Sequence, residues 1–215
     1  MQAQDRDPLV ARTFAALPDA LTCAMFVCAW ISPLTLGYQR VRDLMLLMLI
    51  EFIVMHSGAF TAAIFGMDDL SRLKRALFLT GLTAFYMVFI LAFSLAFDSA
   101  WPIWGFLWLF VSRFLQLVTS PAETGTKMQR MLGGWVMSAM IYLLGAVATA
   151  FLPLPSLGLT PEVIAGLHLS GGGLWIDQPW TVMAFGAFYF GVLGYTKLRG
   201  VTPVIGEPAG REVKR

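Results

Sequence analysis

Charged residues are scarce in this chain. Only 13% of its 215 residues are Asp, Glu, Lys or Arg, whereas 58% are hydrophobic and the mean hydropathy is +0.72. Soluble domains carry roughly 25% charged residues, so the surface of this protein is too apolar to face water. A net charge of only +2 also excludes the dense basic surface of a nucleic-acid-binding protein. The composition therefore predicts an integral membrane protein in contact with the lipid bilayer.

Cysteine and histidine are also rare, with two of each. Cys23 and Cys28 lie five positions apart in one apolar segment and point about 140° away from each other on a helix, so they cannot bridge within it. The chain has no Gly-x-Ser-x-Gly or His-Glu-x-x-His sequence, and only one histidine falls within an apolar segment. We therefore expect no catalytic residue, no metal and no cofactor, including a haem with two axial histidines.

Long apolar runs dominate the rest of the sequence. A membrane-spanning helix needs about 20 mostly apolar residues. Six segments qualify, and they are Asp19–Leu36, Val41–Gly66, Ala76–Phe97, Ala100–Val118, Met131–Leu152 and Pro179–Leu198. The predicted fold is thus all-α, a compact bundle of six transmembrane helices. Residues 1–199 form one transmembrane domain in this interpretation, and residues 200–215 form a mobile cytoplasmic tail.

The N-terminal residues before the first run are expected to form a short amphipathic helix. The polar, acidic stretch Met1–Asp7 lacks the basic start of a cleaved signal peptide. Asp7 suits an N-cap and Pro8 the first helical position. The apolar side chains that follow predict a helix lying along the cytoplasmic interface and separate from the first span.

The distribution of Lys and Arg predicts the orientation. Twelve of the fifteen fall on the same side as both termini, Arg40 and Arg42 fall on the other side, and Arg113 falls inside a span. Basic residues concentrate in cytoplasmic loops, so both termini are expected in the cytoplasm. The short loops are typical of a bacterial inner-membrane protein.

Three ionisable residues fall at membrane depth, where such groups are costly and mark candidate sites. Glu51 and His56 lie in the second segment with Ser57, and Arg113 lies in the fourth with Gln116. Their depths would let the arginine reach Glu51 and offset the desolvation of both charges. His56 points about 140° away from Glu51 on the same helix.

Two small residues, Gly58 and Ala62, share the helix face of Glu51. Small residues let neighbouring helices approach closely, so we expect the second segment to lie at the centre of the bundle. Its polar residues fit three interpretations. They form a buried structural network, a pathway for a proton, ion or substrate, or a catalytic site.

The longest connection, residues 153–178, is expected outside. Thr160, Pro161 and Glu162 are typical of the start of a short helix. This helix either rests on the outer interface or forms a lid that is hinged at the glycines after Ser170. Glu162, His168 and Asp177 would bind a cation only if the loop folded back on itself.

The leading functional prediction is a transporter or a channel-like protein that uses the centre formed by Glu51, His56 and Arg113. The first alternative is a non-catalytic accessory or structural subunit of a larger membrane complex. The second alternative is an intramembrane enzyme. The lipid bilayer is the expected partner in every case, together with a homo-oligomer or a larger membrane complex, and nucleic acid is not.

Overall fold

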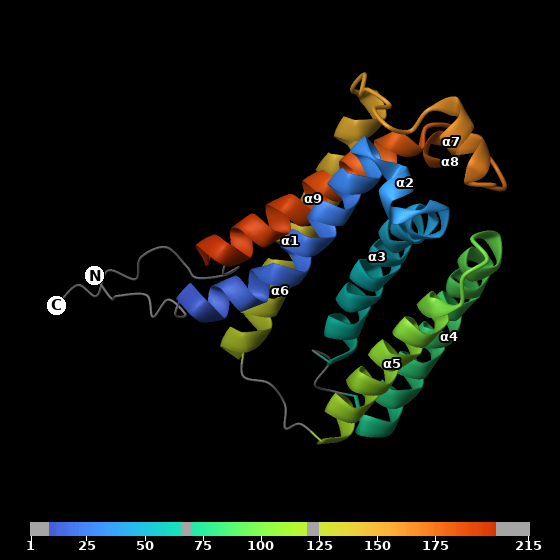
Figure 1. Ribbon diagram of the computed structural model, residues 1–215. Coiled ribbons are helices and arrows are strands. Elements are labelled where there is room, and N and C mark those ends of the chain that lie inside the picture. The colour runs from blue at the N-terminus through green and yellow to red at the C-terminus, as the bar shows by residue number, and fades with distance from the viewer. Residues whose placement is uncertain (1–8, 66–69, 120–124, 201–215) are drawn as a thin grey trace.

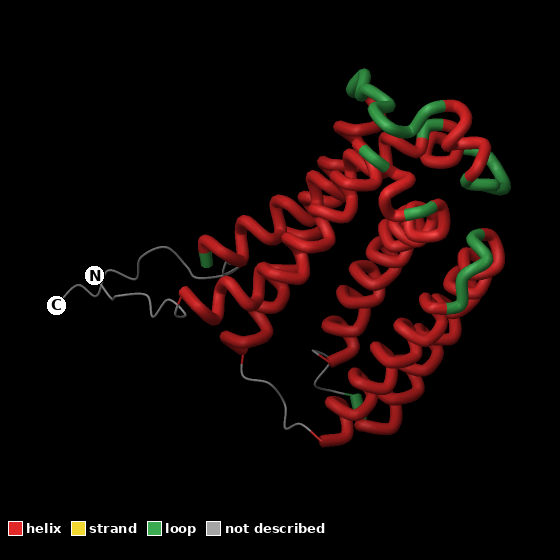
Figure 2. The backbone as a smooth tube through the Cα atoms, viewed as in Figure 1, coloured by secondary structure: helices red, strands yellow, loops and turns green. Residues whose placement is uncertain are grey.

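The computed structural model describes residues 9–65, 70–119 and 125–200. Within these ranges the chain is all-α, with 84% of residues in helices and no strand (Figure 2). The expected all-α class is therefore confirmed. The N-terminal residues up to Pro8 and the tail beyond Gly200 lie outside the described residues.

Each of the six expected apolar segments coincides with one long helix. These helices are α1 (Leu9–Ile31), α3 (Tyr38–Phe65), α4 (Arg72–Ala96), α5 (Trp101–Thr119), α6 (Gly125–Phe151) and α9 (Pro179–Arg199). Short helices occupy the connections, namely α2 (Pro33–Leu36), α7 (Pro161–Gly166) and α8 (Leu174–Asp177). Thr160 is the N-cap of α7, and its hydroxyl accepts a hydrogen bond from the amide of Val163.

Four helices of the described chain, not six, are both long and apolar enough to cross a membrane. They are α1, α3, α4 and α6. Part of α5 lies outside the residues whose side chains are described. Helix α9 has 21 residues, but three glycines and two tyrosines lower its hydropathy. The low hydropathy of α9 has a physical reason. Over half of the helix is buried against protein, and small and aromatic residues serve that packing.

The beginning of the chain differs from expectation. A separate amphipathic helix was predicted before the first span, but α1 runs without interruption from Leu9 to Ile31 and contains Pro18. Proline removes one backbone hydrogen bond and does not always end a helix. Helix α1 ends at Ile31, and Ser32 is the N-cap of α2, which begins at Pro33.

The helices form two groups joined by α3 (Figure 1). Helices α1, α6 and α9 lie together on one side, and α1 and α9 make the most extensive contact in the molecule. Helices α4 and α5 form a hairpin on the other side. Helix α3 packs against α4, α5, α6 and α9, so it is central among the described helices. The connection with α7 and α8 lies at one end of the bundle.

Hydrogen bonds attach α6 to α3, and close packing joins α1 to α9. The hydroxyl of Tyr142 in α6 donates to the carbonyl oxygen of Met48 in α3 at 2.8 Å, and the indole of Trp135 donates to that of Met55 at 2.7 Å. These donors and acceptors are each seven residues apart, so the antiparallel helices α3 and α6 are joined at two levels. Gly186 of α9 lies so close to α1 that a Cβ there would come within 2.3 Å of the Phe26 ring.

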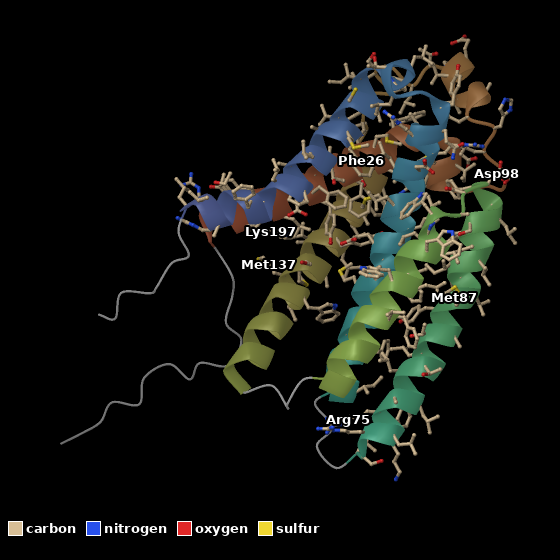
Figure 3. All side chains as sticks on the ribbon, turned by 60° about the horizontal axis from the view of Figure 1, so that its bottom comes forward. Phe26, Arg75, Met87, Asp98, Met137 and Lys197 are labelled. Atoms are coloured by element: carbon tan, nitrogen blue, oxygen red, sulfur yellow. The ribbon has the colours of Figure 1, made fainter. Side chains whose placement is uncertain are left out.

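The hairpin of α4 and α5 is attached to α3 at its tip. Asp98, with φ of 48°, makes the tight turn between the two helices. One carboxylate oxygen of Asp43 in α3 accepts from the hydroxyl of Ser99 at 3.1 Å and from the indole of Trp101 at 3.3 Å. Figure 3 shows Asp98 at this end of the hairpin and Arg75 at the opposite end. Asp43 therefore fixes the tip, a role that the sequence pattern did not reveal.

Candidate functional site

Glu51 is the centre of the candidate site. It lies in the middle of α3 and is half-buried. The hydroxyl of Tyr189, from the buried helix α9, donates to its Oε1 atom at 2.7 Å. The Oε2 atom has no hydrogen-bond partner among the described residues. A carboxylate with one neutral partner and one open oxygen is unusual at membrane depth, where ionisable groups normally pair.

Aromatic rings surround this carboxylate. The Tyr142 ring lies edge to face with Tyr189 at 5.4 Å and with Phe185 at 4.7 Å between ring centroids. Edge-to-face packing suits rings because their positive edges meet negative faces. Gly145 makes the packing possible, since a Cβ there would meet the Phe185 ring at 2.9 Å. The rings hold both hydroxyls, those of Tyr142 and Tyr189, in fixed positions.

A salt bridge lies on the other side of Tyr189. The ammonium of Lys197 in α9 is 2.5 Å from Oδ2 of Asp19 in α1. The side chain of Asp19 is only 11% exposed, whereas that of Lys197 is 46% exposed. This Asp19 oxygen accepts no conventional hydrogen bond, so the ammonium is its compensating partner. Both charges interact electrostatically with Glu51.

The packing of α1 against α9 brings Asp19 and Lys197 together. Gly194 of α9 packs against Asp19 and Ala20 of α1, where a Cβ would meet atoms at 3.5 Å. The close approach of the two helices encloses Asp19 and leaves the longer lysine to reach it from the end of α9. Figure 3 shows Lys197 and Phe26 on the same side of the molecule, at the contact of α1 with α9.

His56 does not join Glu51. Its side chain is exposed, its Nδ1 atom lies 3.0 Å from the carbonyl oxygen of Phe52, and its ring lies 4.0 Å from that of Phe52. Glu51 and His56 thus lie on different faces of α3. Gly58 is half-buried. The side chains of Arg113, Gln116 and Ala62 lie outside the described residues, so the expected pairing of Arg113 with Glu51 stays a prediction.

Ser57 belongs to a second polar location. It lines a small cavity between α3, α4 and α5 with the hydroxyl-bearing residues Thr61, Thr83 and Tyr86. The cavity measures about 10 Å³, which is room for about one water molecule. The hydroxyl of Ser57 donates to the carbonyl oxygen of Val54 at 2.9 Å.

The three candidate residues of the connection 153–178 have different surroundings. Glu162 and His168 are exposed, and Asp177 accepts a hydrogen bond from the amide of Gly173 at 3.2 Å. A hydrogen bond from the Thr160 side chain lowers the pKa of Glu162. In the described part of the chain, no three His, Cys, Asp or Glu residues gather in a way that would hold a metal ion.

The first half of this loop is attached to the bundle. The indole of Trp30 donates to the carbonyl oxygen of Pro155 at 2.8 Å, and the amide of Gly158 donates to that of Trp30 at 3.0 Å. Leu159 and Leu167 are buried. The glycines that follow Ser170 are exposed, and two of them have positive φ. Helix α7 is thus anchored to the bundle through its apolar side, and its position at a membrane interface stays a prediction.

Sequence reasoning missed Tyr189, Tyr142, Asp19 and Lys197. A hydroxyl or a buried charge inside an apolar helix needs a partner. The identity of that partner depends on which helices are neighbours, and the spacing along the chain does not contain this information.

In comparison with known proteins, the chain matches no protein-family model, no curated protein and no solved structure.

Proposed function

We propose that this chain is a small multi-pass membrane protein with a transport or channel-like role, and that Glu51 contacts the transported species. The observation that carries the proposal is the half-buried carboxylate in the middle of an apolar helix, with only the neutral hydroxyl of Tyr189 as its described hydrogen-bond partner. Burial of a carboxylate in this setting is costly, and a pathway for a cationic species gives a reason for it.

The proposal includes the topology. All six long helices cross a bacterial inner membrane, with both termini in the cytoplasm and α7 and α8 outside. The charge distribution of the sequence supports this orientation. The end of α9 lies against the first turns of α1, because a Cβ at Gly200 would contact Arg12 at 3.1 Å. This contact supports a location of the start of α1 and the end of α9 on the same side of the membrane.

In this topology, polar side chains lie at successive depths between the cytoplasmic interface and the membrane centre. Lys197 lies two residues before the end of α9 and would face the cytoplasmic interface. Tyr189 lies eight residues deeper, about 12 Å along the helix, at the level of Glu51. Helix α3 therefore presents its carboxylate midway between the two membrane surfaces, and Arg113 and Gln116 of α5 are proposed to approach the same level from the other helix group.

The rival role is an accessory subunit of a larger membrane complex. It is supported by the hydrogen bonds of Trp135 and Tyr142 and by the pair of Asp19 with Lys197. These interactions satisfy polar groups within one chain and would serve a purely structural core equally well.

Ion flux through purified protein in liposomes separates the two roles. Gradients of H⁺, Na⁺ and K⁺ are imposed one at a time and followed with an ion-sensitive dye inside the vesicles. We expect the wild type to conduct at least one ion and Glu51→Gln to lose most of that flux. Glu162→Gln, which changes an exposed carboxylate of the outer loop, is the matched control and should retain it. If the wild type conducts none of the three while Glu51→Gln lowers the melting temperature, the accessory role is supported instead.

A further inference from the structure

We propose that the species exchanged at Glu51 is a proton, and that the charges of Asp19 and Lys197 control its uptake. The inference rests on the proposed function only for the claim that proton uptake serves transport. The exchange itself is simple in chemical terms. The Glu51 carboxylate accepts a proton from hydronium or water and becomes a carboxylic acid, and the reverse step returns the carboxylate.

The partner of Glu51 suits a group that changes its charge. A tyrosine hydroxyl is both a donor and an acceptor. Tyr189 therefore donates to the carboxylate, as its 2.7 Å contact with Oε1 shows, and can either accept from or donate to the protonated acid. The hydrogen bond that holds Glu51 in place thus survives the loss or gain of the proton.

The surroundings of Glu51 fit a proton better than a metal ion. Sodium, calcium and magnesium ions need several oxygen ligands, about six for the divalent ions. The described hydrogen-bond partner of Glu51 is instead the hydroxyl of Tyr189, whose ring packs against those of Phe185 and Tyr142. Tyr142 carries a second hydroxyl. One of these hydroxyls already donates to Met48. A single carboxylate among rings can hold a proton without any further ligand.

The titratable and charged groups around Glu51 come from three helices. Helix α9 supplies Tyr189 and Lys197, α6 supplies Tyr142, and α1 supplies Asp19. His56 belongs to α3 itself and points elsewhere, and Tyr86 of α4 lines the separate cavity with Ser57. Asp19 and Lys197 are therefore the formal charges among the described residues that act on Glu51. They have opposite signs, so the removal of one or the other should change the protonation of Glu51 in opposite directions.

A carbodiimide probe reads the protonated form directly. The O–H group of a carboxylic acid adds across one C=N bond of dicyclohexylcarbodiimide, and the product rearranges to a stable N-acylurea. No leaving group is formed, and the carboxylate does not react in this way. Full-length protein in liposomes is treated at a series of pH values, and the labelled fraction of Glu51 is measured by mass spectrometry. Asp43 and Glu162 are internal references.

We expect the labelling of Glu51 to fall as the pH rises. Lys197→Met removes a cation and leaves Asp19 unbalanced, so the midpoint pH should rise. Asp19→Asn leaves Lys197 unbalanced, so the midpoint should fall. Lys197 lies eight residues from Tyr189, about 12 Å along α9, and at such a separation, with an effective dielectric constant of about 20, one charge is worth on the order of one pH unit. If the two substitutions acted only by disturbing the packing, both would shift the midpoint in the same direction.

The outcomes are distinct. Opposite shifts support the inference. An absence of labelling at every pH, or shifts of one sign in both variants, overturns it, even if the liposomes conduct Na⁺ or K⁺ and the proposed function stands. Opposite shifts without any ion flux would support proton exchange at Glu51 and reject transport. Elution of each variant as a single species in detergent confirms that the comparison is made on folded protein.

Discussion

At the scale of single residues, polar groups inside this bundle form hydrogen bonds with partners that are distant in the sequence. Glu51 contacts a tyrosine 138 positions away, and Tyr142 contacts a backbone carbonyl 94 positions away. In an apolar medium each such bond replaces an unsatisfied group, which would cost several kcal/mol. The hydroxyls of two tyrosines therefore help to position α3 against α6 and α9.

The hydrogen bond of Tyr189 gives a residue-scale prediction. Tyr189→Phe keeps the ring but removes the donor to Glu51, and a hydrogen bond to a charged group contributes about 1.5–3 kcal/mol. We expect a loss of this size in the free energy of unfolding at neutral pH, measured by denaturant titration in detergent micelles. Tyr195→Phe is the matched control, since Tyr195 lies on the exposed side of the same helix. Equal losses in the two variants would contradict the assigned role of Tyr189.

At the scale of helices, the close packing of α1 with α9 depends on glycine. Gly186→Ala would place a Cβ 2.3 Å from the buried Phe26 ring, whereas Gly81→Ala in α4 would meet nothing within 4 Å. Overpacking of this kind costs typically about 1–3 kcal/mol. We therefore expect Gly186→Ala to lower the melting temperature in detergent, and Gly81→Ala to leave it unchanged or raise it slightly. A stable Gly186→Ala variant would mean that α1 and α9 are not packed as described.

The helices themselves could be predicted from the sequence, but their neighbours could not. Apolar run length located all six long helices to within a few residues at most ends, and the N-cap of α7 followed from Thr160 and Pro161. The exceptions have physical causes. Pro18 did not end α1, and α9 has too little hydropathy for a lipid-facing span because its glycines and Tyr189 face other helices. Hydropathy measures contact with lipid, so it cannot show which helix is enclosed by others.

The same distinction explains the candidate site. Glu51 could be identified because a carboxylate in an apolar run is conspicuous whatever surrounds it. Asp19 and Lys197 fall near the ends of their segments, where charges are ordinary, and only the contact of α1 with α9 makes Asp19 buried. Tyrosine within a span is likewise ordinary until its hydroxyl is seen to reach a carboxylate.

At the scale of the whole molecule, the two helix groups share α3 and are joined at one end. Asp43 holds the tip of the α4–α5 hairpin to α3, and the hydroxyl of Ser170 in the outer loop donates to the carbonyl oxygen of Ala96 at 3.4 Å. Both attachments lie at the end that carries α7 and α8. The proposed orientation makes this the outer end, so the polar path from Lys197 to Glu51 opens toward the cytoplasm.

That orientation gives the last prediction. Twelve Lys and Arg residues on the side of the termini, against two on the other, predict that the connection between α3 and α4 is cytoplasmic. Single cysteines are introduced at positions 70, 124 and 170 after replacement of Cys23 and Cys28, and intact cells are treated with a membrane-impermeant maleimide. Position 170 should react, and positions 70 and 124 should react only after the membrane is permeabilised. Permeabilised cells are the control for accessibility. Reaction at position 70 in intact cells would reverse the orientation, because Lys197 and Asp19 would then face the outside and Glu51 would exchange its proton with that compartment.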